Sequence, residues 1–363
     1  MAISELTLYE RLPASALRTL PRTALGTFPT PVQSLVLATA AGDCPILVKR
    51  DDLCADGYAG NKIRKLEFLL ADAAERGSRR LSTAGAAGSH HAFATAYHGI
   101  AQGFDVSLVL FPQTRTSHVR TMLQLDRAAG AEMRWASRME AVPYGLWRAR
   151  LAHRRDRPCV IPPGGSNAVG TAGYVNAALE LASQIEAGDV AAPSSIHVAA
   201  GTLGTVAGLA IGLAWAGLDV PIIATRITPL LVTNERSLAA LVQATHELLT
   251  GVGAVLPTAA DALRLVDLRH DHFGDSSGRA TDAGNEATRI FANAGLQLDP
   301  TYTAKAAATL LCDIATGSGG AQPLFWHTLS ANEPTELLER DTLPPLPAPF
   351  ARYLDPDTGR DHE

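Results

Sequence analysis

The sequence predicts an α/β protein with mostly parallel β-sheets, and two observations support this class. Short apolar runs typical of buried strands alternate with longer segments in which apolar residues recur every three or four positions, as in amphipathic helices. Strands separated by helices of this length form βαβ units, whose strands pair in parallel. The chain of 363 residues is long enough for about two domains.

The predicted elements follow this alternation in order. Residues 1–35 are expected to be loosely structured, with 27–32 extended because each proline excludes the helical region for its predecessor. Strands are predicted at 46–49, 81–84, 106–111, 132–135, 159–161, 196–199, 222–225 and 324–327. Helices are predicted from Ile63 to Ala73 and at 89–102, 119–129, 139–152, 168–187, 234–249, 282–294 and 303–315, with a further helix ending at Ala216.

Composition and charge argue against several classes of function. The net charge of −5 and the pI near 6.1 do not favour a nucleic-acid partner or an anionic membrane. The longest apolar run, Val206–Leu218, is shorter than the about 20 residues that span a bilayer. The four cysteines show no zinc spacing, and residues 1–10 lack the apolar core of a signal peptide. We therefore expect a cytoplasmic protein without a membrane partner.

The first candidate for chemistry is the stretch from Ala59 to Glu67, where a helix is predicted to begin. Gly60 allows a tight approach of the backbone, and Asn61 leads into Lys62 and Lys65. The positive end of the helix dipole slightly disfavours a charged ammonium, which suits an amine that acts as a nucleophile. The alternative is an ordinary loop-to-helix junction with surface lysines.

The second candidate is the loop Gly201-Thr202-Leu203-Gly204-Thr205, between a buried strand and a helix. Glycines let the backbone close around an anion, while N–H groups, hydroxyls and the helix dipole favour its charge. The loop is neither a Walker A motif nor a GxGxxG fingerprint, because no Gly-Lys follows and Leu203 replaces the second glycine. It is predicted to bind a phosphate, or else to be a glycine-rich turn without a ligand.

The third candidate combines a serine with nearby histidines. Ser89 is placed as the N-cap of a helix, where exposed N–H groups would suit a small carboxylate. The stretch lacks the flanking glycines of a hydrolase nucleophile elbow. No metal is expected at His90, His91 and His98, because adjacent histidines point to different faces and no carboxylate lies at helical spacing.

Two further stretches precede predicted helices. Ile161–Asn167 contains two glycines before a capping Ser or Asn, and Leu298–Lys305 contains Asp-Pro before Tyr302 and Thr303. Each fits either an ordinary capped helix or a loop beside a ligand. A nucleophilic lysine, a phosphate loop and an anion-binding helix start, with no metal, together predict a cofactor with an aldehyde and a phosphate. Pyridoxal 5'-phosphate is the obvious candidate for such a cofactor.

These stretches, in this order, resemble the pyridoxal-phosphate enzymes with the tryptophan-synthase-β type of fold (fold type II). The runs Lys49–Leu53 and Gly60–Leu69 are similar to the branch that contains 1-aminocyclopropane-1-carboxylate (ACC) deaminase and D-cysteine desulfhydrase. The resemblance implies two three-layer α/β domains, the smaller inserted in the larger, and a homodimer. The larger domain would comprise residues 1–60 and 175–332, the smaller domain 61–174, and a proline-rich tail without regular elements 333–363.

The resemblance also implies roles for single residues. Lys62 would form the Schiff base with the cofactor. The other cofactor-binding residues that it implies are Asn61, Lys65, His90, Thr303 and the loop residues Gly201, Thr202, Leu203, Gly204 and Thr205. The substrate contacts that it implies are Ser89, His90, His91, Ser277, Tyr302 and Thr328. Of these, Ser89 and Tyr302 would be catalytic together with Lys62.

Two positions distinguish the activities of this branch. ACC deaminases have Glu after the tyrosine and Leu after a late histidine, whereas desulfhydrases have small hydroxyl residues, as here with Thr303 and Thr328. A hydroxyl keeps the ring nitrogen of the cofactor protonated only weakly, which suits α-proton removal coupled to loss of a β-leaving group. The substrate side departs from the family, because Ser276-Ser277-Gly278 replaces Gly-Tyr-Gly and Gly88-Ser89-His90 replaces Gln-Ser-Asn.

The sequence therefore predicts a pyridoxal-phosphate lyase that removes a β-leaving group from a small amino acid and yields a keto acid and ammonia. D-Cysteine is the nearest substrate in the family. The alternatives are ACC ring opening, a β- or γ-replacement enzyme of a specialised pathway, and a non-catalytic protein that binds the cofactor.

Overall fold

The chain divides into two compact units in the computed structural model, which describes residues 7–40, 42–339, 343 and 346–353. The larger unit comprises residues 1–68 and 166–332, and the smaller unit comprises 69–165 and 333–363. The sequence predicts boundaries at 60/61 and 174/175 instead. The difference arises because the first turns of two helices, at 61–68 and 166–174, pack with the larger unit.

The larger unit contains a six-stranded sheet in the order β1-β2-β10-β7-β8-β9. Its strands are β1 (Val32–Thr39), β2 (Gly42–Arg50), β7 (Ile196–Ala200), β8 (Ile222–Arg226), β9 (Val266–Arg269) and β10 (Leu324–His327). β1 pairs antiparallel with β2, and the other neighbouring strands are parallel. Because parallel strands end at one edge of a sheet, residues that follow β2, β7 and β10 are brought together there.

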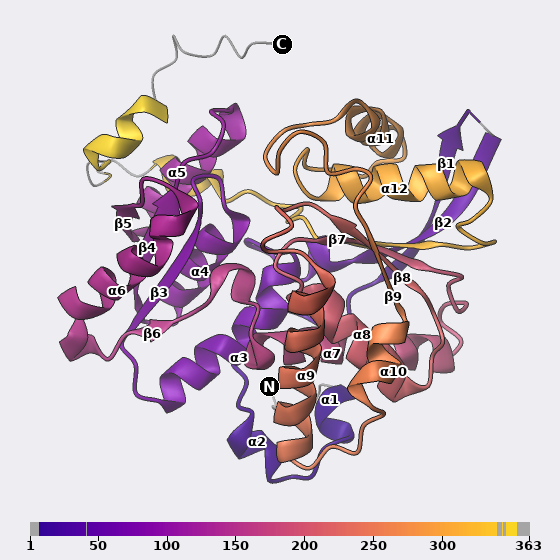
Figure 1. Ribbon diagram of the computed structural model, residues 1–363, viewed down its shortest axis with the longest axis horizontal. Coiled ribbons are helices and arrows are strands. Elements are labelled where there is room, and N and C mark those ends of the chain that lie inside the picture. Colours follow the sequence, from indigo (N-terminus) through magenta and orange to yellow (C-terminus); the bar gives the residue numbers. More distant parts are fainter. Residues whose placement is uncertain (1–6, 41, 340–342, 344–345, 354–363) are drawn as a thin grey trace. The chain divides into compact units, whose positions relative to one another are not determined.

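Helices cover both faces of this sheet (Figure 1). One face carries α11 (Asp282–Asn293) and α12 (Thr303–Thr316), and the other carries α7 (Ala168–Glu186), α8 (Gly204–Ala216), α9 (Glu235–Gly251) and α10 (Ala259–Arg264). Side chains alternate along β10, so that Trp326 packs with the α7–α8 side and Phe325 with the α11–α12 side. Two short helices, α1 (Thr7–Glu10) and α2 (Ala16–Thr19), pack on the α7–α8 side.

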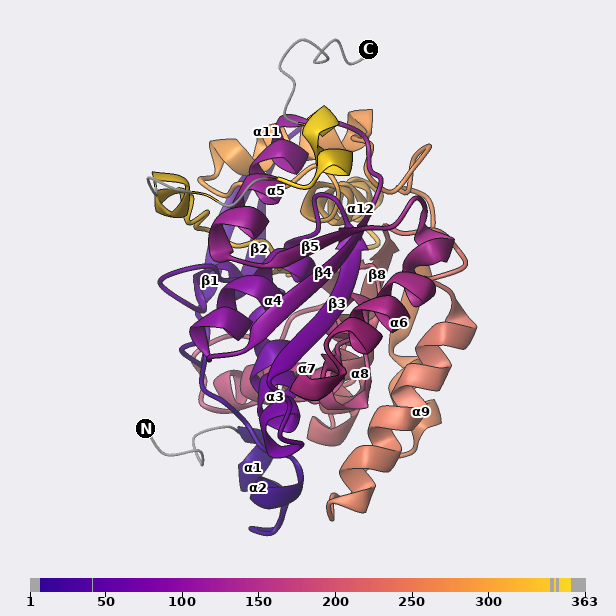
Figure 2. The same cartoon turned by 90° about the vertical axis from the view of Figure 1, so that its left-hand side faces the viewer.

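The smaller unit contains a parallel sheet in the order β5-β4-β3-β6. Its strands are β3 (Arg80–Ala86), β4 (Asp105–Phe111), β5 (Glu132–Trp135) and β6 (Cys159–Val160). Figure 2 shows α4 (His90–Ala101) and α5 (Ser117–Ala129) on one side of this sheet and α6 (Val142–Ala152) on the other. The helix α3 (Asn61–Glu75) begins in the larger unit and ends in the smaller. Single 3-10 turns lie at Asp51–Leu53, Met139–Ala141, Arg154–Asp156 and Pro163–Gly165.

Part of the predicted proline-rich tail is ordered, which corrects the expectation that it lacks regular elements. Two 3-10 turns, Thr335–Glu339 and Ala348–Tyr353, group with the smaller unit. The ring of Phe350 is buried and lies edge-on to Trp135, with 5.2 Å between ring centroids. Two aromatic side chains, Phe350 and Tyr353, therefore anchor a segment whose prolines exclude longer helices. The other positions of the predicted tail, 340–342, 344–345 and 354–363, lie outside the described residues.

The predicted strands and helices are present, and their ends agree within a few residues. The expectation of loose structure before residue 35 is wrong in part, because β1 begins at Val32 and two short helices precede it. The sequence also misses β9 and α10. Both β1 and β9 are edge strands with few buried side chains, so neither has the continuous apolar run of a central strand.

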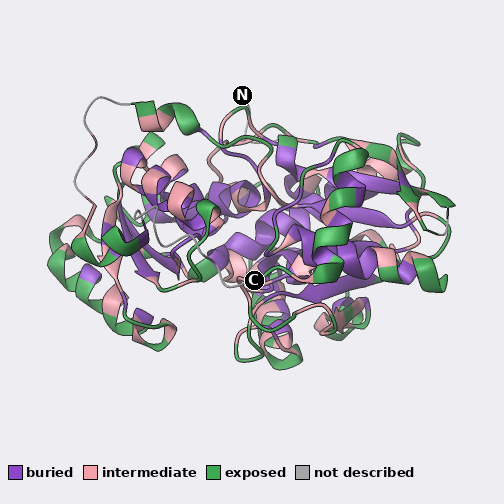
Figure 3. Cartoon of the chain, turned by 90° about the horizontal axis from the view of Figure 1, so that it is seen from above, coloured by how far each residue is buried: buried purple, intermediate pink, exposed green. Residues whose placement is uncertain are grey.

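Burial follows the layers, with buried strands and with helices exposed on their outer faces (Figure 3). Among the described residues, no helix combines the length and apolar character needed to cross a membrane.

Helices α7 and α8 approach closely through glycines. A Cβ atom at Gly208 would lie 2.4 Å from the Cβ of Tyr174 and 2.7 Å from the carbonyl oxygen of Thr171. A Cβ atom at Gly212 would lie 2.6 Å from the Cβ of Ala178. Neither glycine has a positive φ, so close packing rather than backbone conformation requires them. The close approach holds the beginning of α8 against α7.

We predict that Gly208→Ala lowers the free energy of unfolding by about 1–3 kcal/mol, because the added methyl group must push the two helices apart. Gly251→Ala is the matched control, because Gly251 is also helical and its added Cβ would meet no atom within 4 Å. The control should be neutral or more stable by up to about 1 kcal/mol. Urea denaturation of both variants tests this, and equal effects would contradict the packing argument.

Candidate active site

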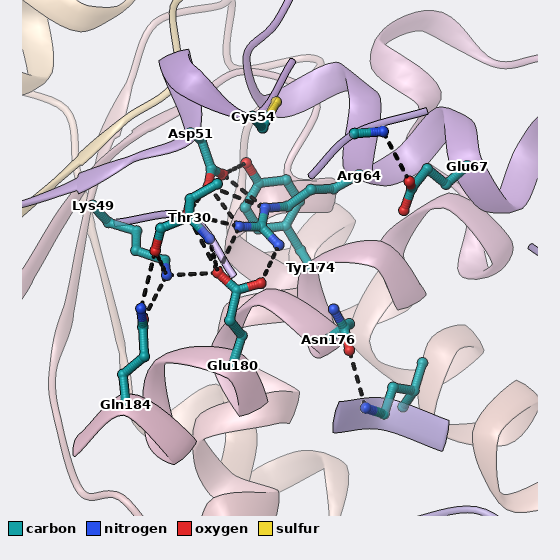
Figure 4. A network of polar contacts seen from close by, with 12 residues as sticks. Thr30, Lys49, Asp51, Cys54, Arg64, Glu67, Tyr174, Asn176, Glu180 and Gln184 are labelled. Atoms are coloured by element: carbon teal, nitrogen blue, oxygen red, sulfur yellow. Dashed lines mark hydrogen bonds and ion pairs between the residues drawn. The ribbon is translucent and has the colours of Figure 1, made fainter. Parts of the chain in front are cut away.

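A buried cluster of charges holds the beginning of α3 in place (Figure 4). The guanidinium group of Arg64 forms ion pairs with Asp51 at 2.7 Å and with Glu180 at 2.8 Å. The ammonium group of Lys49 pairs with the Oε1 atom of the Glu180 carboxylate at 2.6 Å. The four side chains are almost fully buried, and two cations balance two carboxylates. The cluster joins β2, α3 and α7 to the turn after β2.

Neutral donors complete the hydrogen bonding of Asp51. The hydroxyl of Tyr174 donates to it at 2.6 Å and the indole N–H of Trp326 at 2.8 Å. Burial alone would raise the pKa of Asp51, but Arg64 and these donors hold the pKa below its usual value. Burial likewise opposes the charge of Glu180, and Arg64 and Lys49 keep its pKa lowered. Both carboxylates are therefore ionised at neutral pH.

The cluster determines which way the two lysines of α3 point. Lys62 and Lys65 are three residues apart and share one helix face, while Arg64 projects from a different face. Burial lowers the pKa of Lys62 to about 8, and the charge of Asp299 partly opposes this. Burial also lowers the pKa of Lys65 well below its usual value, and Lys62 adds repulsion. Two neighbouring amines that burial drives towards neutrality form a site that an anion would stabilise.

The loop before α8 meets these lysines. The side-chain amide of Asn61 donates to the hydroxyl of Thr205 at 3.2 Å. Lys65 donates to the hydroxyl of Ser166 at 3.3 Å. Ser166 in turn lies 2.7 Å from the hydroxyl of Thr202 and accepts from the N–H of Gly204 at 3.2 Å. The structure thus brings together the lysine stretch and the glycine loop, which are about 140 residues apart in the sequence.

The glycine loop leaves no space for side chains where it meets Lys65. A Cβ atom at Gly204 would lie 2.6 Å from the Ser166 hydroxyl and 2.8 Å from the Lys65 ammonium. Leu203, which replaces a glycine, has a φ of 67° in the left-handed region. Such a conformation costs a non-glycine residue on the order of 1–3 kcal/mol, and strain of this kind concentrates at ligand sites. The backbone of Leu203 therefore keeps the left-handed conformation that glycine adopts easily.

The group of donors around this loop has the chemistry of a phosphate site. It contains an ammonium group, three hydroxyls, an amide and the N–H groups of the first turn of α8, which have no partner within the helix. Helix N-termini and ammonium groups both favour a dianion. A phosphate beside Lys65 would also restore its charge.

The end of β10 lies against the same turn of α3. The carbonyl oxygen of Thr328 accepts from the N–H of Asn61 at 3.1 Å. Gly60 has a φ of 90°, and a Cβ atom there would lie 2.7 Å from the Thr328 oxygen. The backbone of Thr328, which the sequence predicts to contact substrate, is therefore hydrogen-bonded to Asn61, the residue before Lys62.

The beginning of α12 contributes Tyr302 and Thr303 together with a carboxylate that the sequence does not single out. Asp299 accepts hydrogen bonds from the backbone N–H groups of residues 301–303 and from the Thr303 hydroxyl. Burial raises the pKa of Tyr302 to about 12, and Asp299 adds to the shift. The phenol of Tyr302 therefore keeps its proton at physiological pH. Asp299 also acts on Lys62 electrostatically, so α12 and α3 contribute to one site.

Ser277 lies in a loop that α12 also holds. Its hydroxyl donates to the carbonyl oxygen of Ile227, just after β8, at 2.7 Å. Lys305 donates to the carbonyl oxygens of Phe273 and Ser276 at 2.7 and 3.0 Å. The Ser277 side chain thus helps to fasten the loop to the end of the sheet where Gly201 also lies, because Ile227 is next to Gly201.

The stretch from Ser89 to His91 belongs to the smaller unit. Ser89 caps α4 as predicted and accepts from the N–H of Ala92 at 3.2 Å. The ring of His90 lies beside that of His118, with 4.8 Å between centroids. The ring of His91 is buried, and its Nε2 atom lies 2.9 Å from the hydroxyl of Thr83 on β3. The contact to Thr83 orients His91 towards the sheet, a role that the sequence does not predict.

Two functional candidates were missed by reasoning from the sequence alone. Ser166 lies in the loop Ile161–Asn167, whose glycines and capping residues are a signal for a ligand loop without indicating which side chain matters. Asp299 precedes Pro300 in the stretch Leu298–Lys305, and this pair by itself indicates no more than the start of a helix. In the described part of the chain, no group of three or more histidine, cysteine or acidic side chains is placed to hold a metal ion.

The sequence matches a known protein family and several curated relatives. Residues 23–328 match the family described as pyridoxal-phosphate dependent enzyme. A D-cysteine desulfhydrase of Salmonella paratyphi B (strain ATCC BAA-1250 / SPB7) is 36% identical over 327 residues, which cover 87% of this chain and 96% of the relative. A D-cysteine desulfhydrase of Salmonella typhi is similar to the same extent.

Solved structures agree with this similarity. The crystal structure of an ACC deaminase homologue matches with a TM-score of 0.73 and 30% identity, over 90% of this chain and 99% of that chain. A maize serine racemase matches with a TM-score of 0.58 over 90% of this chain and 95% of that chain, and its 17% identity supports the shared fold alone. These matches confirm the predicted fold class, an α/β fold of type II with mostly parallel sheets.

We predict that Asp51→Asn destabilises the protein by about 3–5 kcal/mol, because it leaves the buried Arg64 without its closest counter-charge. The control is Asp219→Asn, which breaks an exposed pair with Arg264 and should cost about 0–1 kcal/mol. Because the pKa of Asp51 is lowered, its contribution is present at neutral pH and is lost as acid protonates it. Denaturant melts at neutral pH test this, and similar losses for both variants would contradict it.

We predict that limited reductive methylation of the cofactor-free protein modifies Lys62 first. The chain has four lysines, of which Lys49, Lys65 and Lys305 are buried and Lys62 is partly exposed. With a pKa of about 8, the Lys62 amine should gain reactivity as the pH rises through that value, well below the range of an ordinary lysine. Peptide mass mapping across a pH series measures this. Earlier modification of another lysine would contradict the assignment of Lys62 as the accessible amine.

Proposed function

Because the chain belongs to the family of pyridoxal-phosphate-dependent enzymes, we propose that it is a lyase that removes the β-leaving group of a small amino acid, with D-cysteine as its leading substrate. One observation carries the proposal, namely 36% identity to D-cysteine desulfhydrases over 96% of their length. The contacts of Asn61 and Lys65, which lie on either side of Lys62, with a phosphate-type donor group independently support the cofactor.

The residues of the larger unit fit this cofactor. We propose that the phosphate is held by the loop Gly201–Thr205 together with Lys65 and Ser166, whose donors suit a dianion. Lys62 would be the attachment residue, because it is the partly exposed lysine and its lowered pKa provides neutral amine near physiological pH. The packing of Gly204 against Lys65 and Ser166 supports the same conclusion, since any larger residue would fill the donor group.

Pyridoxal phosphate, when bound, supplies an electron sink for negative charge that develops at the α-carbon of an amino acid. The protein supplies the proton transfers. Lys62 would remove the α-proton as general base, for which a pKa of about 8 is well matched to physiological pH. Tyr302 keeps its proton, since its pKa is raised to about 12, and would donate a hydrogen bond to the departing sulfur.

The overall reaction is balanced with water as the only other reactant. D-Cysteine and water give pyruvate, hydrogen sulfide and ammonia, so no oxidant or second substrate is needed. The roles implied for Ser89, His90 and His91 at the substrate stay predictions, as do those of Ser277 and Thr328. The homodimer also stays a prediction.

ACC ring opening is the second candidate, because the ACC deaminase homologue is 30% identical and covers 90% of this chain. Residues at two positions favour elimination instead. Thr303 follows Tyr302 and Thr328 follows His327, where ACC deaminases are expected to have Glu and Leu. Thr303 lacks the carboxylate that Glu would provide, and Thr328 lacks the apolar side chain that Leu would provide.

We predict keto-acid release from D-cysteine and faster release from β-chloro-D-alanine, because chloride leaves more easily than hydrosulfide. The L forms and ACC are measured under the same conditions, with keto acid and sulfide as separate readouts. Lys62→Ala should lose about 100-fold or more of the rate, as expected when a general base is removed. Lys305→Met, which removes the loop-fastening lysine instead, is the comparison for a buried lysine outside the proposed proton transfers.

Faster turnover of ACC than of every β-substituted amino acid would replace this proposal with the second candidate. Binding of amino acids without any keto acid would favour a replacement enzyme or a non-catalytic protein.

A further inference from the structure

The turn Ala348–Tyr353 lies beyond residue 328, the last residue that matches the family, and is nevertheless fixed to the smaller unit. The guanidinium group of Arg352 lies 4.6 Å from the centre of the Trp135 ring, and the ring of Tyr353 lies 6.3 Å from the same ring. On α5, beside the turn in Figure 2, Arg120 donates to the carbonyl oxygen of Tyr353 at 3.3 Å. The end of this turn is therefore held in a defined place.

The hydroxyl of Tyr353 holds the loop between β4 and α5. It accepts the backbone N–H of Gln113 at 3.2 Å and donates to the carbonyl oxygen of the same residue, also at 3.2 Å. Arg115 in this loop donates to the carbonyl oxygen of Arg352 at 3.4 Å. Because the side chain of Tyr353 is buried, little water competes for these contacts. The backbone of Gln113 is thus fixed by one phenolic hydroxyl.

The same loop holds the residues that precede α4. The side-chain oxygen of Gln113 accepts the N–H of Gly88 at 3.0 Å. The Nε2 atom of His118, in the first turn of α5, donates to the carbonyl oxygen of Gly88 at 3.2 Å. The N–H of Ala87 donates to the carbonyl oxygen of Phe111 at 2.9 Å. Both polar groups of the Gly88 backbone are therefore bound to the segment that Tyr353 holds.

We infer that Tyr353 is a positioning residue for the substrate, which acts through Gln113 on Ser89 and His90. Tyr353 fixes the backbone of Gln113, and Gln113 fixes Gly88, the residue before Ser89. The inference rests on the proposed function, in which Ser89 and His90 meet the substrate. The donors proposed for the phosphate lie in the larger unit, so this chain of contacts does not include them.

The first test is the kinetics of the holoenzyme with Tyr353→Phe, which keeps the ring and removes the hydroxyl. KM for β-chloro-D-alanine should rise about 2- to 10-fold, the effect of losing a hydrogen bond, while kcat and retention of the cofactor stay nearly unchanged. Lys62 and Tyr302, which are proposed to transfer protons, lie outside this chain of contacts. Tyr144→Phe is the matched control, because Tyr144 is a tyrosine of the same unit that is 61% exposed, and it should leave KM unchanged.

The second test is hydrogen exchange of the holoenzyme without substrate, measured by mass spectrometry. The amides of residues 87–89 should exchange faster in Tyr353→Phe than in the wild-type protein or in Tyr144→Phe, because their partners in the loop are loosened. Gln113→Met, which removes the acceptor of the Gly88 N–H, should give the same result. Adding Tyr353→Phe to Gln113→Met should raise KM little further, since both variants break one chain of contacts.

An unchanged KM in Tyr353→Phe would overturn the inference, whatever the exchange shows. Additive effects of the two variants on KM would overturn it as well, because Tyr353 would then act by another route. Loss of the cofactor in Tyr353→Phe would indicate a general structural role and would also contradict it. If Tyr353→Phe does not fold, Gln113→Met must raise both KM and the exchange of residues 87–89, or the inference fails.

The proposed function fails separately, if the wild-type holoenzyme releases keto acid from no amino acid, and the substrate role of Tyr353 then fails with it. Normal turnover by the wild-type protein and equal KM values for the wild type and Tyr353→Phe would overturn the inference alone.

Discussion

The ion pairs of Arg64 are the interaction on which the site depends. Arg64 projects from α3 into a buried group of opposite charges, and its neighbours Lys62 and Lys65 project from another face of the same helix. Anchoring one face therefore sets the direction of the other. A buried ion pair is weak evidence for net stability, since desolvation offsets most of its attraction. Here the ion pairs fix the orientation of α3, because any other orientation would leave a buried charge without a partner, which is costly.

The loop before α8, which faces the lysines, is also fixed by buried contacts. The beginning of α8 is held by glycine contacts with α7, and α7 also carries Glu180 and Tyr174 of the charge cluster. The lysines and the loop that faces them are thus fixed to one common helix. The two lysines lose charge on burial unless an anion is present, so the geometry of the larger unit is best satisfied by a ligand with a phosphate.

Much of the fold was predictable, because central strands and amphipathic helices have strong periodic signals. The edge strands β1 and β9 were not predicted, because most of their side chains are exposed or only partly buried and give no apolar run. Lys62 and the loop before α8 were recognisable because their chemistry lies in consecutive residues. Ser166 was not, because its partners Lys65 and Thr202 come from distant segments. Asp299 was not, because its contacts with the backbone at the start of α12 and its effect on Lys62 arise only in the folded chain.

The most direct test of the account is borohydride reduction of the holoenzyme followed by peptide mass mapping. Lys49 is paired with Glu180, Lys305 is bonded to two carbonyl oxygens, and Lys65 contacts Ser166, which leaves Lys62 as the expected attachment site. The account predicts a pyridoxyl group on the peptide that contains Lys62, at that residue and in a ratio of about one per chain. A pyridoxyl group on Lys49, Lys65 or Lys305, or on no lysine, would contradict it.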